Sequence, residues 1–69
     1  MDDFSLGGRP YVELHNLLKL LGLCSSGGAA KAVIDDGRVT VEGKVERRKR
    51  CKIVAGQTVE FEGKRVTVS

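Results

Sequence analysis

Hydrophobic residues recur at two spacings along this chain of 69 residues, a helical spacing in the first half and an alternating one in the second. The first helical pattern is a stripe of leucines at positions i, i+3, i+4 and i+7, made of Leu14, Leu17, Leu18 and Leu21. The stripe predicts a helix over Tyr11–Leu21, which Gly22 ends. Pro10 suits the first helical position, because a proline lacks the amide hydrogen that would have no partner there.

A second helix is predicted directly downstream. Ser26 can cap the free amide hydrogens of its first turn, and Gly37 can supply the left-handed residue that closes it. Its apolar face consists of Ala30, Val33 and Ile34. Because only a short link at Leu23–Cys24 separates the two helices, we expect them to pack against each other.

The second half of the chain reads as short strands. Val39 and Val41 alternate with polar residues, and Ile53–Val54 is a short apolar strand. Two longer alternating stretches, Thr58–Phe61 and Lys64–Val68, flank Glu62-Gly63, a dipeptide suited to a hairpin turn. Val59 and Phe61 are expected to share a face with Val66 and Val68. Residues 1–8 form a leader or an edge strand. We therefore predict one α+β domain over residues 1–69, with two N-terminal helices packed on a small, mostly antiparallel sheet.

Length and residue types narrow the function. A chain of this size buries a modest core, so a large enclosed active site is not expected. No apolar run approaches membrane-spanning length and no signal-peptide pattern opens the chain, so we expect a cytoplasmic protein without a membrane partner. In the reducing cytoplasm, Cys24 and Cys51 are expected to be reduced thiols. Neither a nucleophile nor a set of metal ligands accompanies His15, so we predict no enzyme activity, catalytic residue, metal, cofactor or small-molecule substrate.

Positive charge is concentrated between Lys44 and Lys52. This segment holds six basic residues and one acidic residue, a net charge of +5, whereas the whole chain has a net charge of +3. The basic residues are Lys44, Arg47, Arg48, Lys49, Arg50 and Lys52. Because arginine forks match phosphate oxygens, the segment predicts a nucleic acid partner. A basic segment can also be a solvated surface or bind an acidic protein, and the residues alone leave these alternatives open.

The start of the second helix is another candidate anion site. Ser26, Gly27 and Gly28 carry no bulky side chain, so a phosphate could reach the amide hydrogens at the positive end of the helix dipole. Lys31 lies one turn further on and could add a charge. The small residues Gly27, Gly28, Ala29 and Ala30 would also let the two helices cross closely there, and the sequence favours neither explanation.

Three stretches taken together resemble the RNA-binding domain named after ribosomal small-subunit protein S-four. They are Ser26-Gly27-Gly28 with Ala30-Lys31, then Gly37-x-Val39-x-Val41-x-Gly43, then Glu46-x-Arg48-Lys49-Arg50-Cys51-Lys52-Ile53 followed by Gly56-Gln57. The likeness covers about Phe4 to Ser69. It is strongest to the short, stand-alone YbcJ-like branch of ribosome-associated, bacterial-type proteins.

The resemblance implies an αL motif, in which two helices and the following loop form a basic surface that holds structured RNA. It implies that the partner is ribosomal RNA or its precursor, and that the ribosomal subunit is a further partner. Two departures are Gly27-Gly28, where larger members have basic residues, and Glu42, whose charge would weaken a phosphate contact. The three aromatic residues offer little for base stacking, so we expect contacts to phosphate and shape. The predicted RNA-contact residues are Ser26, Gly27, Gly28, Lys31, Arg38, Lys44, Arg47, Arg48, Lys49, Arg50 and Lys52.

Overall fold

The structure, a computed structural model, describes residues 2–69. Its elements follow in the order β1 (Asp2–Phe4), β2 (Val12–Glu13), α1 (Leu14–Leu20), α2 (Gly27–Asp35), β3 (Val39–Val41), β4 (Lys44–Val45), β5 (Lys52–Ile53), β6 (Thr58–Phe61) and β7 (Lys64–Val68). The predicted α+β class is confirmed. Within the described range, no helix is both long enough and apolar enough to cross a membrane.

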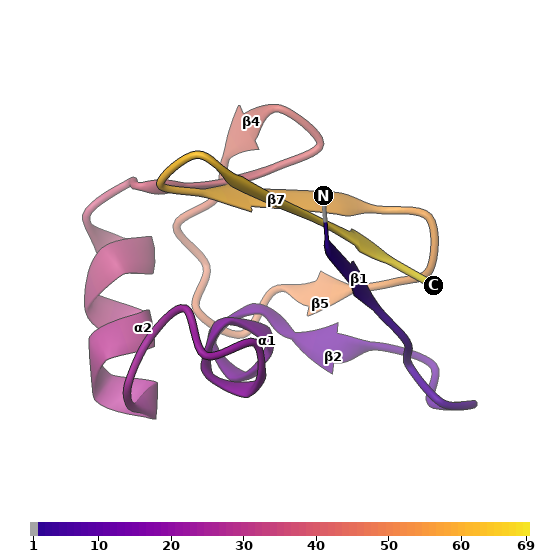
Figure 1. Ribbon diagram of the computed structural model, residues 1–69. Coiled ribbons are helices and arrows are strands. Elements are labelled where there is room, and N and C mark those ends of the chain that lie inside the picture. The colour runs from indigo at the N-terminus through magenta and orange to yellow at the C-terminus, as the bar shows by residue number, and fades with distance from the viewer. Residues whose placement is uncertain (1) are drawn as a thin grey trace.

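The strands form two separate sheets. The larger has the strand order β1-β7-β6-β3-β4, and all its pairings are antiparallel except that of β1 with β7. Strands β2 and β5 make a small antiparallel ribbon of their own. Figure 1 shows the large sheet as one layer, with the two helices and the β2–β5 ribbon on the same side of it. Residues 2–4 are thus an edge strand, one of the two forms expected for the leader.

Both hairpins of the large sheet turn on the dipeptide Glu-Gly. Glu62 and Gly63 have φ of +50° and +79° between β6 and β7, and Glu42 and Gly43 repeat this geometry between β3 and β4. Two successive left-handed residues match the right-handed twist of the flanking strands. The predicted turn at Glu62-Gly63 is confirmed, and so is the shared buried face of the two strands. In register, Val59 lies opposite Val66, whereas Phe61 lies opposite Lys64.

Helix α2 forms as the sequence predicts. The Ser26 hydroxyl accepts a hydrogen bond from the Ala29 amide at 3.1 Å, which caps the first turn. At the other end Gly37 adopts φ +76°, its amide donates to the Ile34 carbonyl, and the Arg38 amide donates to the Val33 carbonyl. This pair of bonds is the Schellman closure, which satisfies carbonyls that would otherwise lack partners.

Helix α1 is shorter than predicted. The expected start at Tyr11 is wrong, because Val12–Glu13 is a strand paired with β5 and the helix begins only at Leu14. Val12 is 3% exposed opposite Ile53, and a β-branched residue suits such a pleated, buried position. Pro10 therefore precedes the strand and does not open the helix. The predicted end of the helix before Gly22 is confirmed, since the helix ends at Leu20 and Gly22 follows with φ +74°.

The core lies between the large sheet and the helices. Leu14, Leu17 and Leu18 of α1 are fully buried, as are Ala30 and Ile34 of α2. The inward residues of the sheet cover them from the other side, and Ile53 of the ribbon closes the core beside α1. Ile53 anchors β5 in the core, and the segment that leads into β5 carries four of the twelve basic residues of the chain.

Candidate nucleic-acid interface

The connection between β4 and β5, residues 46–51, is called the basic loop from here on. Its backbone is bonded to the start of α1. The Leu14 amide donates to the Cys51 carbonyl at 2.9 Å and the His15 amide donates to the Lys49 carbonyl at 3.0 Å. Glu13, at the cap position of α1, offers no side-chain cap. Because two of the helix's free amide hydrogens are satisfied by the basic loop, the loop is held on a rigid element.

His15 adds a side-chain contact to the same carbonyl. Its Nδ1 lies 2.9 Å from the Lys49 carbonyl oxygen, and since a carbonyl can only accept, Nδ1 carries the hydrogen. The other ring nitrogen, Nε2, lies 3.8 Å from the Glu13 carboxylate, and the side chain is 16% exposed. His15 is therefore a packed residue that positions the basic loop.

Inside the basic loop, Glu46 and Arg48 form a close pair. The Glu46 carboxylate accepts three hydrogen bonds of 3.0 Å, from the Arg48 amide, Nε and Nη2. These bonds, first those from the side chain and then that from the backbone, stabilise the charged carboxylate and lower the pKa of Glu46 from 4.5 to about 2. The Arg48 side chain nevertheless stays 78% exposed. One of the predicted cations thus also braces the loop.

The remaining charges gather on the β5 side of the basic loop. Arg48, Arg50 and Lys52 line one open cleft of about 400 Å³ together with Cys51. Burial, followed by the nearby Glu46 charge, raises the pKa of the Cys51 thiol, so the neutral thiol is favoured in this cleft. Among the described residues, Lys49, Arg50 and Lys52 form no ion pair with a carboxylate. Three unneutralised cations on or beside one short, anchored loop suit a phosphate-bearing ligand.

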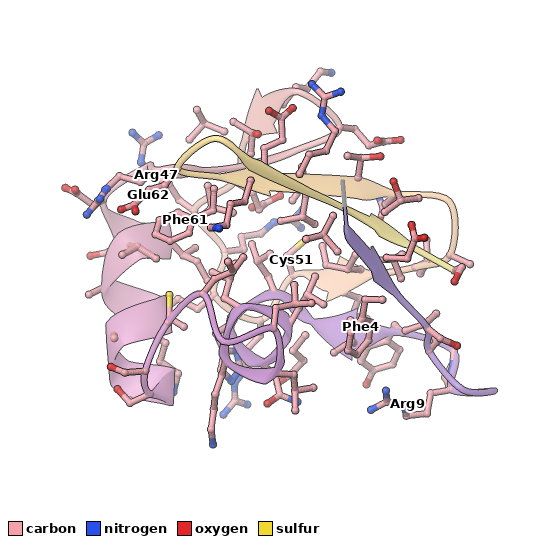
Figure 2. The ribbon with its side chains drawn as sticks, viewed as in Figure 1. Phe4, Arg9, Arg47, Cys51, Phe61 and Glu62 are labelled. Carbon is pink, nitrogen blue, oxygen red and sulfur yellow. The ribbon has the colours of Figure 1, made fainter. Side chains whose placement is uncertain are left out.

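Two further arginines lie at the end of α2. The Arg47 guanidinium covers Gly37 so closely that a Cβ atom at that glycine would lie 2.6 Å from Nη2. Arg38 is ion-paired with Glu62, and its guanidinium carbon lies 5.7 Å from the centroid of the Phe61 ring. Figure 2 shows Arg47, Phe61 and Glu62 together at this end of the helix. The Arg38 charge is thus partly neutralised, whereas the Arg47 charge has no carboxylate partner among the described residues.

Comparison with known proteins identifies the family. The model of the S4 domain matches residues 4–69. The chain belongs to the S4 domain family. The predicted resemblance to this family and to its YbcJ-like branch is therefore confirmed.

Similar proteins are known from two bacteria. The chain is 60% identical over 68 residues to "Putative RNA-binding protein YbcJ" of Escherichia coli K12, which covers 99% of this chain and 97% of that protein. "Uncharacterized protein YbcJ" of Shigella flexneri matches to the same extent. The solution structure of YbcJ from E. coli, described as revealing an αL motif involved in RNA-binding, has a TM-score of 0.75 to this S4 domain. It is 60% identical, and the alignment covers 99% of this chain and 86% of that one.

The first turn of α2 is open in this S4 domain. A Cβ atom at Gly27 would meet nothing within 4 Å, and one at Gly28 would meet only the Ser26 hydroxyl oxygen, at 3.8 Å. No neighbouring helix therefore approaches Gly27 or Gly28 closely, so close crossing does not explain these two glycines, whereas Ala30, the last of the small residues, is fully buried in the core. This turn and the Gly37 end covered by Arg47 are separated by the length of α2, about 13 Å at 1.5 Å per residue. Lys31, between them on the helix, is partly buried.

Glu42 lies in the tight turn between β3 and β4, and Lys44 is the first residue of β4. Lys44 is exposed. Glu42 is bonded to β6 through both its backbone and its side chain, since its amide donates to the Thr58 carbonyl at 2.9 Å and its carboxylate accepts from the Thr58 amide at 3.0 Å. The carboxylate thus joins the end of β3 to β6, which gives Glu42 a structural role.

The sequence does not predict two residues that contact the basic loop or its neighbour Lys52. His15 bonds the loop, and the Lys52 ammonium nitrogen lies 5.0 Å from the centroid of the Tyr11 ring. The pattern offered no signal for the His15 contact, which joins residues 34 positions apart. Tyr11 would have been found had Tyr11–Glu13 been read as a strand beside Lys52–Ile53.

Proposed function

We propose that this S4 domain is a non-enzymatic cytoplasmic protein that binds structured RNA through contacts to phosphate and shape. The observation that carries this proposal is that the basic loop is bonded to α1 by its own backbone, while among the described residues no carboxylate pairs with Lys49, Arg50 or Lys52. A rigid set of cations can match the phosphate spacing of folded RNA, because little conformational freedom is lost on binding. The "RNA-binding" name of the E. coli relative supports the same partner.

The proposed contact surface has a centre and two flanks. Its centre is the cleft of Arg48, Arg50 and Lys52, with Lys49 on the same loop and Lys44 in the preceding strand. Arg47 and Arg38 extend it toward the end of α2, and Ser26, Gly27, Gly28 and Lys31 extend it along that helix. Arg48 and Arg38 contribute less per charge than the others, because each already has a carboxylate partner.

We further propose that the RNA is ribosomal RNA or its precursor, bound on the ribosomal subunit. The proposal rests on the resemblance to ribosome-associated members of the branch. An acidic protein surface is the alternative ligand for the same cations. Treatment of a pull-down with ribonuclease distinguishes the two, because partners held through RNA are released and partners held by protein contact are retained.

Filter binding of a ribosomal RNA stem-loop tests the proposal directly. The double variant K49Q/R50Q removes two cations of the basic loop, and K64Q/R65Q removes two cations from the sheet strand β7, where Arg65 pairs with Glu60. Both variants lose the same formal charge. We expect only K49Q/R50Q to flatten the dependence of log K on log salt, by roughly 0.7 to 0.9 for each lost phosphate contact. Equal effects of the two variants would refute the assignment of the site.

A further inference from the structure

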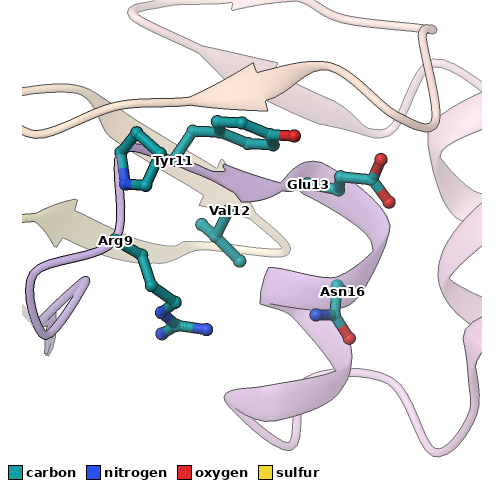
Figure 3. A pocket seen from close by; sticks show the side chains of 6 residues that line it. Arg9, Tyr11, Val12, Glu13 and Asn16 are labelled. Atoms are coloured by element: carbon teal, nitrogen blue, oxygen red, sulfur yellow. The ribbon is translucent and has the colours of Figure 1, made fainter.

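A second cleft lies next to the basic loop but shares none of its residues. It has a volume of about 300 Å³ and is lined by Arg9, Pro10, Tyr11, Val12, Glu13 and Asn16. These residues come from the segment before β2, from β2 itself and from the first turns of α1. Figure 3 shows Arg9 and Asn16 on the side of the chain to which Val12 points, with Tyr11 and Glu13 on the other.

Arg9 is held in place before any ligand arrives. Its Nε donates to the Leu6 carbonyl at 2.7 Å, and its guanidinium carbon lies 5.8 Å from the centroid of the Phe4 ring. Among the described residues, no carboxylate pairs with it, so both terminal nitrogens keep their donors. A fixed guanidinium with free terminal nitrogens is suited to a phosphate, which it can bind through two parallel hydrogen bonds.

The other side chains of this cleft offer contacts that a nucleobase can use. The Asn16 amide is both a donor and an acceptor, as an unpaired base edge requires. Tyr11 presents an aromatic ring in a residue that is 37% exposed. An aromatic ring, an amide and a phosphate-binding arginine are the groups that hold bases outside a helix, whereas a paired stem keeps its base edges engaged and its bases stacked.

Tyr11 also links this cleft to the basic loop. The Lys52 ammonium nitrogen lies 5.0 Å from the centroid of the Tyr11 ring, and Lys52 lines the neighbouring cleft of about 400 Å³ together with Arg50. The pairing of β2 with β5 places Lys52 opposite Glu13, and the Lys52 side chain reaches back to the ring of Tyr11, the residue before β2. An RNA strand on the basic loop could therefore continue past Lys52 and Tyr11 toward Arg9 while its phosphates stay close to cations.

We propose that the cleft between Arg9 and Asn16 binds one unpaired nucleotide that continues from the RNA held on the basic loop. Its phosphate contacts Arg9 and its base edge contacts Asn16, while the Tyr11 ring, on the other side of the chain, stacks on the neighbouring base of the strand. This inference rests on the proposed RNA binding of the basic loop and adds that a junction between paired and single-stranded RNA is preferred. It departs from the expectation, drawn from the small number of aromatic residues, that base stacking is not the main mode of recognition.

The test compares two RNAs, a blunt stem-loop and the same stem-loop with one strand extended beyond the stem. We expect the wild-type protein to bind the extended RNA more tightly. R9Q should lower the affinity for the extended RNA by about fivefold, the effect of one phosphate contact at 0.1 M salt, and leave the blunt RNA unaffected. R65Q, which removes an arginine from β7, should not discriminate between the two RNAs. A 2-aminopurine in the extension should lose fluorescence when it stacks on Tyr11, and Y11L should abolish that loss.

Each result decides one question. If wild type binds both RNAs equally, or if R9Q weakens both by the same factor, the nucleotide site is refuted while the basic loop stands. If wild type binds neither RNA, the proposed function itself fails. Should R9Q lower the melting temperature, N16A, which changes a polar side chain of α1, takes its place and must weaken only the extended RNA. Retention of an acidic peptide in this cleft, with no preference for extended RNA, would also overturn the proposal.

Discussion

Replacement of Glu46 by glutamine tests whether the basic loop is braced from within. The glutamine keeps the size of the side chain but removes the charge that accepts three hydrogen bonds from Arg48. The formal net charge of the chain rises from +3 to +4. The loss of the hydrogen bonds is measured as a change in stability, and the gain in net charge is measured as a change in RNA binding.

The expected loss of stability follows from the geometry of the pair. A hydrogen bond to a charged group contributes roughly 1.5 to 3 kcal/mol, whereas exposed ion pairs contribute about 0.2 to 1 kcal/mol. The Glu46 side chain is 17% exposed and that of Arg48 is 78% exposed, which places the pair between these cases. We therefore expect E46Q to lower the free energy of unfolding at neutral pH by about 1 kcal/mol.

The effect of pH has a definite sign. The pKa of Glu46 is about 2 in the folded chain against 4.5 for an unperturbed carboxyl. A lowered pKa stabilises the fold above the unfolded value, and this contribution is lost as the pH falls through the folded value. The stability difference between wild type and E46Q should therefore be constant above about pH 5 and shrink from pH 4.5 toward pH 2.

Urea unfolding of wild type, E46Q and E60Q at a series of pH values measures this difference. Glu60 pairs with the exposed Arg65 at 3.5 Å and is the matched control, for which we expect a change below about 0.5 kcal/mol. In filter binding, E46Q should steepen the salt dependence by up to about 0.9, because the released Arg48 adds one phosphate contact. A stability gap between wild type and E46Q that is as large at pH 2 as at neutral pH would refute the reasoning.

Three further predictions concern the elements that hold the site, and unfolding in urea measures all three. H15A should lower the free energy of unfolding by about 1 kcal/mol and speed hydrogen exchange in the basic loop, because the Lys49 carbonyl loses a donor; unchanged exchange there would contradict the brace. G28A should raise stability by about 0.5 to 1 kcal/mol, since there is room for a Cβ atom in α2. G37A should lower stability by about 1 to 2 kcal/mol, since φ is +76° and Arg47 must move. Each variant is the control for the other, because the same glycine-to-alanine change is expected to have opposite signs at the two positions. L18A should cost about 2 to 5 kcal/mol because Leu18 is fully buried, and a loss below 1 kcal/mol would contradict the core.

Local signals explain what the sequence predicted correctly about the fold. Ser26, Gly37 and the Glu62-Gly63 turn act on neighbouring residues, so their effect can be read from a short window. The start of α1 could not be read in this way. Its first amide hydrogens are satisfied by carbonyls of the basic loop, and the strand before it exists only because β5 lies beside it. Partners distant in the chain decide that boundary, and no pattern within Tyr11–Leu21 reveals them.

The charge pattern located the candidate site but not the state of each cation. Counting charges treats all basic residues alike, yet Arg48 and Arg38 have carboxylate partners whereas Arg50 has none among the described residues. The glutamates that pair with them differ in distance along the chain. Glu46 is two positions from Arg48, so this ion pair can be predicted from the sequence. Glu62 reaches Arg38 only because β3 and β6 are paired.

The fold of this domain determines where the cations of the basic loop lie. The carbonyls of Lys49 and Cys51 face the amide hydrogens of α1, so the backbone between them has a fixed direction relative to the helix. Arg50 lies between these two carbonyls, and with the backbone anchored on both sides its side chain has only its own rotamers left. A change that frays the start of α1 would free the backbone as well and spread the cations. RNA affinity should therefore fall with the stability of the first turn of α1 even when no basic residue is altered.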